Sequence, residues 1–176
     1  MSRRVHQVGF FAAVILIVLV IVGARYQEID LPLLRSLQGH NRIDPLSLHL
    51  SGEFVEGNLG VKQDADGSLT LRILAQQYLF IPHCVVLPAG VPVHLRITSA
   101  DAVHVLAVTG TDYKVTAVPG AVSEASMEFT RPGEYDMPCH EFCGAGHYAM
   151  RSRLVVVPRD QFPMTEAEEG GRCAAR

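Results

Sequence analysis

The most informative segment of the chain is the run CHEFCGAGHYAM, from Cys139 to Met150. Two cysteines, a histidine and a methionine follow one another at intervals of four, four and three residues: Cys139, Cys143, His147 and Met150. Soft sulfur ligands combined with imidazole select copper or zinc over hard cations. A proline before the run and two glycines within it disfavour a helix. The spacing therefore predicts a loop between two strands, folded around a buried metal.

The number of ligands distinguishes the kinds of metal site. A mononuclear blue-copper site uses one cysteine, two histidines and a weakly bound methionine, so this run holds one thiolate more than such a site needs. Two thiolates can instead bridge two copper ions, each completed by one histidine and one weak ligand. A structural zinc site of two cysteines and two histidines and a disulfide between Cys139 and Cys143 remain alternatives, but neither accounts for Met150.

A binuclear centre requires a second histidine from elsewhere in the chain, and His104 is the best candidate. It lies in the apolar sequence AVHVL, at the start of an expected core strand, where an unpartnered imidazole would be costly to bury. Four other histidines are interpreted as surface or linker residues: His40, His49, His83 and His94.

The elements that must hold this loop are predicted to be β-strands. Short apolar segments alternate with turn sequences, which indicates eight strands at residues 69–74, 84–87, 91–98, 103–108, 113–118, 125–129, 134–138 and 153–157. Strands of this length and spacing are typical of an antiparallel sandwich or barrel, so the fold class is all-β. Cys84 is interpreted as a small buried hydrophobic residue of the second strand, whereas Cys173 is left without a role.

The N-terminal region contains an uncharged run of 17 residues, Val8 to Ala24. As a helix it would be about 26 Å long, close to the roughly 30 Å of a bilayer's hydrocarbon core. Arg3 and Arg4 precede it, so the positive-inside rule places the N-terminus in the cytoplasm and the rest of the chain outside. A cleaved signal peptide is the alternative, and it would also export the domain.

Length and charge limit the remaining possibilities. The chain has 176 residues and a net charge of -3, without a basic stripe, which excludes a nucleic-acid partner. The expected organisation is a cytoplasmic tip and transmembrane helix (1–26), a linker (27–60), a metal-binding domain (61–162) and a polar C-terminal tail (163–176).

The loop sequence CHEFCGAGHYAM is similar to the copper-binding loop of cytochrome oxidase subunit II. The upstream stretch SADAVHVLAVTGTDYKVTAVPG resembles the strand that supplies the family's first histidine, and RPGEYDMPCHEFC resembles the lead-in to its loop. The similarity covers residues 69–157 and the N-terminal anchor. With a single expected helix and a short domain, the chain most resembles the ba-type branch of the heme-copper oxidases.

The resemblance implies a cupredoxin-like Greek-key β-sandwich with one N-terminal transmembrane helix and a binuclear copper centre, CuA. Cys139 and Cys143 would bridge the two coppers, and His104 and His147 would each bind one of them. Met150 would be a weak ligand to one ion and the backbone carbonyl of Glu141 to the other. All protein ligands would then be in place, so no substrate is expected to bind the copper.

The resemblance further implies a subunit that takes electrons from cytochrome c or a small cupredoxin. It would pass them to heme in the catalytic subunit I, which holds heme and CuB and reduces oxygen to water. The copper domain would lie on the periplasmic or extracytoplasmic side of the cell inner membrane. Two alternatives remain open: the CuA subunit of a nitric oxide reductase, and a membrane-tethered copper carrier or assembly factor.

The residues that receive the electron are less well defined. The chain contains no tryptophan, whereas many members of the family dock cytochrome c on a tryptophan-containing stretch beside the loop. The corresponding region is residues 76–80, so Tyr78 and Phe80 are candidates for electron uptake, with core packing as the alternative. His140, at a non-ligand position of the loop, is a third candidate.

Overall fold

The computed structural model describes residues 13–23, 42–162 and 173. The chain divides into two compact units, residues 1–40 and residues 41–176. In the first unit, residues 13–23 are helical and their apolar side chains are exposed. Within the described ranges no helix has the length and apolarity that crossing a membrane requires. Both ends of the expected membrane segment, residues 8–12 and 24, lie outside the described residues.

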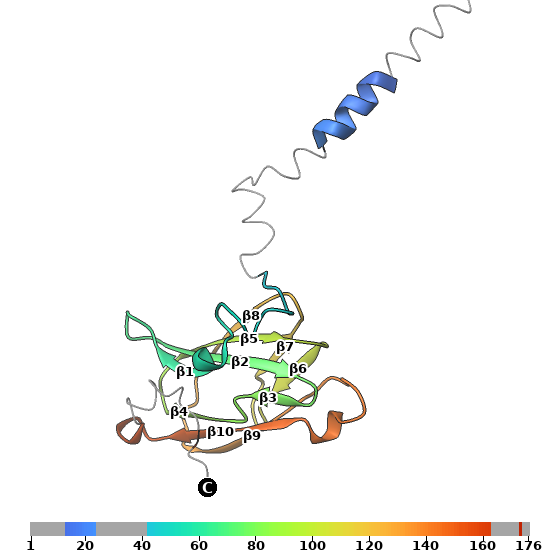
Figure 1. The fold of residues 1–176 in the computed structure, drawn as a ribbon. Coiled ribbons are helices and arrows are strands. Elements are labelled where there is room, and N and C mark those ends of the chain that lie inside the picture. The colour runs from blue at the N-terminus through green and yellow to red at the C-terminus, as the bar shows by residue number, and fades with distance from the viewer. Residues whose placement is uncertain (1–12, 24–41, 163–172, 174–176) are drawn as a thin grey trace, which may run out of the picture. The chain divides into compact units, whose positions relative to one another are not determined.

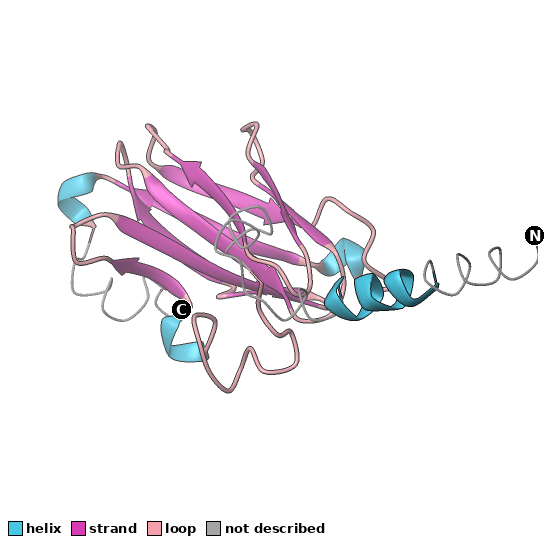
Figure 2. Ribbon diagram, turned by 90° about the horizontal axis from the view of Figure 1, so that it is seen from above, coloured by secondary structure: helices cyan, strands magenta, loops and turns pink. Residues whose placement is uncertain are grey.

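The second unit is a mostly β structure in which two layers of strands face each other (Figures 1 and 2). In the larger sheet the strand order is β1-β2-β5-β8. A short strand, β3, pairs with the end of β2 on the same edge as β1. The bounds of these strands are Gly60–Gln63 (β1), Leu69–Gln76 (β2), Leu79–Ile81 (β3), Val93–Ser99 (β5) and Ser123–Met127 (β8).

The opposite layer consists of a three-stranded sheet of order β4-β10-β9 and a two-stranded sheet, β6-β7. A single bridge between Leu106 on β6 and Cys139, just after β9, connects the two. This connection brings the start of β6 beside the predicted metal loop. The strand bounds are Cys84–Pro88 (β4), His104–Ala107 (β6), Lys114–Ala117 (β7), Gly133–Pro138 (β9) and Arg151–Val157 (β10).

Apolar side chains from both layers form one continuous core. Leu71 and Ile73 of β2, Leu95 of β5 and Leu154 of β10 are completely buried and face this core. The candidate ligands Cys139, Cys143 and Met150 belong to the same buried cluster. The metal loop is therefore built on the end of the core rather than on a separate surface loop.

All eight predicted strands are present, but the prediction of an antiparallel arrangement is wrong for two pairs of them. β2 pairs in parallel with β5, and β10 pairs in parallel with β4. Parallel neighbours need a crossover connection, and here the chain between β2 and β5 runs through β4 in the opposite layer. The strands β1 and β3 were not predicted, because each is only three or four residues long.

The described part of the expected linker packs on the domain. Leu48, Phe54 and Leu59 form a second apolar cluster with Leu74 of β2, and a short 3-10 helix, η1 (Glu56–Asn58), lies within this segment. Ion pairs hold it from outside: the Glu53 carboxylate binds the guanidinium groups of Arg72 and Arg96, on neighbouring strands. These contacts shield the outer face of β2, which explains why six of its eight residues are buried.

Cys84, the first residue of β4, forms a disulfide with Cys173, with a Cα–Cα distance of 5.4 Å. The Cys173 amide also donates a hydrogen bond to the Cys84 carbonyl at 3.4 Å. The interpretation of Cys84 as a small buried hydrophobic residue is therefore wrong, because its side chain is covalently bonded and only partly buried. The available signal was the parity of four cysteines: assigning two to a metal leaves one pair, and an exported domain is oxidised.

Candidate metal centre

The metal loop joins β9 to β10, and its ends are fastened together by a backbone hydrogen bond. The Cys139 amide donates to the Met150 carbonyl at 2.9 Å, so the first and last candidate ligands are neighbours. Between them the chain makes one short 3-10 turn, η2 (His147–Ala149), preceded by Gly144 with a φ of +130°. The loop is thus irregular, as its proline and glycines predicted.

His104 reaches the loop from β6. The His140 amide donates to the Val105 carbonyl at 2.7 Å, and Leu106 forms the bridge with Cys139, so β6 runs alongside the start of the loop. This pairing places His104 Nδ1 3.9 Å from Cys139 Sγ, although the two residues are 35 positions apart. The imidazole is completely buried.

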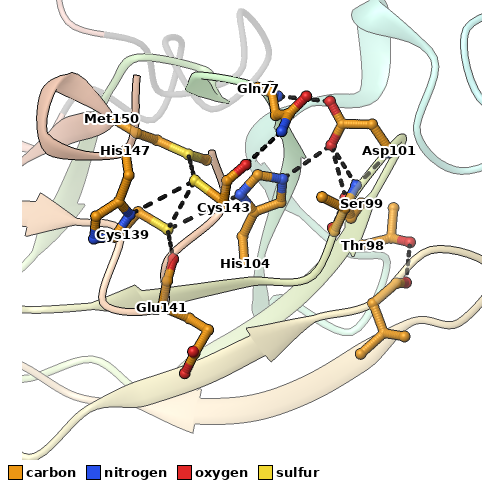
Figure 3. A network of polar contacts seen from close by, with 12 residues as sticks. Gln77, Thr98, Ser99, Asp101, His104, Cys139, Glu141, Cys143, His147 and Met150 are labelled. Atoms are coloured by element: carbon orange, nitrogen blue, oxygen red, sulfur yellow. Dashed lines mark hydrogen bonds and ion pairs between the residues drawn. The ribbon is translucent and has the colours of Figure 1, made fainter. Parts of the chain in front are cut away.

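The six predicted donor groups form one cluster with the two thiols at its centre (Figure 3). Cys139 Sγ lies 3.8 Å from Cys143 Sγ. Besides His104 it has the Glu141 carbonyl oxygen 3.3 Å away. Cys143 Sγ has His147 Nδ1 and Met150 Sδ, each at 3.6 Å. Each sulfur is therefore accompanied by one imidazole nitrogen and one weaker donor.

This donor set fits metal ions better than it fits a disulfide. Metal–sulfur bonds of about 2.3 Å, as for zinc, hold two sulfurs about 3.8 Å apart at a tetrahedral angle, which matches the 3.8 Å between the two Sγ atoms. A disulfide would need about 2.05 Å, and both cysteines are free thiols. The donor atoms of His104, Cys139 and Cys143 all lie within 4.8 Å of one another.

Burial governs the protonation of the Cys143 thiol. Burial and, to a lesser degree, the neighbouring Cys139 together raise the pKa of Cys143 to about 11. Without metal, the Cys143 thiol therefore keeps its proton at neutral pH. Metals bind the thiolate, so their binding must release this proton.

Asp101 determines which nitrogen of His104 faces the cysteines. Its Oδ1 lies 2.9 Å from His104 Nε2, so Nε2 carries the proton and Nδ1 presents a lone pair toward Cys139. Desolvation works to raise the pKa of Asp101, but hydrogen bonds from His104 and from the amides of Gln77 and Ala102 outweigh it and lower this pKa. Sequence reasoning missed Asp101, although an acid three residues before a candidate ligand was visible.

Most of the donor side chains are closed off from solvent. Cys139 and Cys143 are 6% exposed and Met150 1%, whereas His147 is half-buried. The rings of Phe142 and Tyr148 flank His147, with centroid distances of 5.8 and 5.3 Å. Their exposures of 71% and 87% are high for aromatic side chains. Sequence reasoning assigned them no role, although two aromatics at non-ligand positions of a loop were a signal of surface contact.

The structure separates the three candidates for electron uptake. Phe80 is completely buried, with its ring edge-on to His104 at 6.5 Å, so it cannot contact a docked donor and the core-packing alternative describes it. Tyr78 is 36% exposed, and its ring packs against Gly144 and Gly146 of the loop. His140 is exposed.

Residues 68–157 match the family model of the periplasmic domain of cytochrome c oxidase subunit II. The chain is 34% identical over 115 residues to cytochrome c oxidase subunit 2 of Thermus thermophilus, a match that covers 65% of this chain and 85% of the relative. These similarities confirm the family that the loop sequence indicated.

Two solved structures agree with this assignment. A chain of a heme-copper terminal oxidase dimer, determined by cryo-EM, is 28% identical with a TM-score of 0.53, covering 87% of this chain and 99% of that chain. The periplasmic domain of subunit II of the cytochrome oxidase of Bradyrhizobium japonicum shares the fold, with a TM-score of 0.51 at 20% identity over 57% of this chain and 91% of that one. The chain therefore belongs to the cytochrome c oxidase subunit II family.

Proposed function

We propose that this subunit of a heme-copper oxidase accepts electrons at a binuclear copper centre, CuA, and passes them to heme in the catalytic subunit I, where oxygen is reduced to water. The observation that carries the proposal is the closed cluster of six donor groups around two sulfur atoms 3.8 Å apart. A cluster that holds its donors in place before metal binds suits a centre that changes charge without changing ligands.

Each donor has a distinct task in this proposal. The thiolates of Cys139 and Cys143 would bridge two copper ions, and His104 and His147 would each bind one of them. Met150 would be a weak ligand to one ion and the Glu141 carbonyl to the other. When bound, the copper pair supplies a one-electron carrier whose charge is spread over two ions. The protein's part is rigidity, because buried ligands fixed by hydrogen bonds leave little water or backbone to rearrange.

Electrons enter, in this proposal, beside His147. It is the one half-buried ligand side chain of the cluster, and Phe142 and Tyr148 give its surroundings an apolar surface. A cytochrome c or a small cupredoxin would place its own redox centre over this ring. Of the earlier candidates, Tyr78 and His140 lie at the surface and remain compatible with such a contact.

The membrane topology is proposed from the sequence. The uncharged run from Val8 to Ala24, preceded by Arg3 and Arg4, would cross the cell inner membrane once with the N-terminus in the cytoplasm. The disulfide between Cys84 and Cys173 supports an extracytoplasmic position for the domain, because such bonds persist in oxidising compartments.

A copper carrier or assembly factor is the less favoured function. Copper delivery requires ligands that a partner can reach and replace, whereas both bridging sulfurs are buried. Slow release of copper to a mild chelator is therefore expected. Rapid release would favour the carrier.

The test is electron paramagnetic resonance of the full chain, purified with its catalytic subunit. The expected hyperfine pattern is that of one electron shared equally by two coppers, with two copper ions in this chain in addition to the CuB of the catalytic subunit. A pattern from one localised copper, or the absence of a co-purifying heme subunit, would contradict the proposal.

A further inference from the structure

The turn between β2 and β3 lies against the metal loop although it contains none of the proposed ligands. Its first residue, Gln77, makes two polar contacts in different directions (Figure 3). The Gln77 backbone amide donates to Asp101 Oδ2 at 2.7 Å. Its side-chain Nε2 donates to the backbone carbonyl of Cys143 in a short hydrogen bond.

These contacts join the two segments that supply the metal ligands. Asp101 holds His104 through the 2.9 Å contact with Nε2, and the Cys143 carbonyl belongs to the residue whose sulfur is proposed to bridge the coppers. A continuous path therefore runs from the His104 imidazole through Asp101 and Gln77 to the backbone of the metal loop. The bridge between Leu106 and Cys139 joins the same segments by backbone alone.

The next residue, Tyr78, explains why the loop contains glycine at two positions. A Cβ added at Gly146 would collide with the Tyr78 ring, and one added at Gly144 would meet the Tyr78 hydroxyl and lie 3.0 Å from Gln77 Nε2. Because these two loop residues have no side chain, the turn can approach closely enough for the Gln77 amide to reach the Cys143 carbonyl.

We propose that Gln77 is a positioning residue of the copper centre: it fixes the position of Cys143 relative to His104. This inference rests on the proposed function, since it assigns Gln77 a role at the same site. The amide is suited to the task because it donates a neutral hydrogen bond to a carbonyl. A carboxylate would repel that carbonyl, and an apolar chain would leave it unbonded. Gln77 is otherwise exposed, so a core-packing role does not explain these contacts.

The test compares Gln77→Met with Gln76→Met in the full chain assembled with its oxidase. Gln76 is the neighbouring glutamine on β2, and its side chain takes no part in this set of contacts among the described residues. Gln77→Met is expected to release copper to a chelator faster, because removing a group that orients a metal ligand usually lowers metal affinity about 10- to 100-fold. It should also change the hyperfine pattern, whereas Gln76→Met should match the wild type in both measurements.

A second variant separates positioning from folding. Gln77→Glu keeps the size of the side chain but replaces the donor with an acceptor, so it should destabilise the centre at least as much as Gln77→Met. Both variants should unfold cooperatively like the wild type in their copper-free forms. Wild-type hyperfine pattern and copper release in both Gln77 variants would overturn the inference and leave the proposed function intact. A wild-type chain without the two-copper pattern would overturn the proposed function itself.

Discussion

The chain carries two pairs of cysteines in opposite chemical states. Cys139 and Cys143 are four residues apart, buried, and free, with 3.8 Å between their sulfurs. Cys84 and Cys173 are 89 positions apart, partly exposed and bonded to each other. Both pairs belong to the same domain, so the compartment alone does not decide which of them is oxidised.

The difference lies in the groups around each sulfur. Imidazole, thioether and carbonyl donors surround Cys139 and Cys143, and such donors complete a metal shell. Beside Cys84 the described contact is the Arg153 Nε at 3.3 Å, a cation that cannot ligate metal. Proximity of two thiols therefore does not make a disulfide when the rest of a metal site is already built.

The largest effect is expected from Cys139→Ser or Cys143→Ser. A hydroxyl is a poor ligand for copper, and one bridge would be lost. Either variant should lose the two-copper hyperfine pattern, and oxygen consumption driven by a reduced soluble c-type cytochrome should fall to the level of copper-free oxidase. Cys84→Ser is the matched control and should retain the pattern. A two-copper hyperfine pattern retained in Cys139→Ser would contradict the bridging role of this pair of cysteines.

The double variant Cys84→Ser, Cys173→Ser should affect stability instead of copper. Removing a cross-link between residues 89 positions apart should lower the free energy of unfolding by about 2–4 kcal/mol, measured by urea denaturation. Alkylation of the unfolded, unreduced wild type should modify Cys139 and Cys143 alone. Loss of the two-copper pattern in the double variant would show that the pairs are coupled.

Asp101→Ala tests whether copper binding depends on the residue that orients the His104 ring. Without its partner at Nε2, His104 is free to change tautomer, and copper affinity should fall about 10- to 100-fold. Asp101→Asn should fall less, because an amide oxygen still accepts the hydrogen bond. The measurement is a competition titration with a copper chelator. Equal affinities for all three proteins would contradict this role.

The smallest effect on the cluster itself is expected from Tyr148→Ser. Tyr148 is 87% exposed beside His147, so copper content and the hyperfine pattern should stay unchanged. The second-order rate of electron transfer from a reduced c-type cytochrome should fall about tenfold, as for an aromatic contact at an interface. Reduction by a small inorganic reductant is the control and should keep its rate. An unchanged rate with the cytochrome would place the docking surface elsewhere.

Local pattern was enough to predict the strands and the loop. Alternation along β5 and β10 depends on neighbours two residues away, and the loop spacing brings Cys139, Cys143, His147 and Met150 together without long-range information. His104 could be selected because a buried histidine in an apolar strand needs a partner. The ligand roles remain predictions; the variants above test those of Cys139 and Cys143 directly and that of His104 through Asp101.

Pairing over long distances could not be read from the sequence. The parallel contact of β2 with β5 and the bond from Cys84 to Cys173 depend on how the chain crosses between layers. Phe80 is buried whereas its neighbour Leu79 is exposed, because only one side of β3 faces the core. A strand of three residues is too short for its sequence to show which side that is.

The bridge that brings His104 to the loop also sets the order of assembly. The loop ligands are consecutive in the chain, but the first imidazole is 35 positions away and arrives only when β6 pairs beside Cys139. Closing such an interval is slower than forming the loop itself. A chain whose sandwich has not yet closed therefore presents the loop donors without His104, so the complete set of donors exists only after folding.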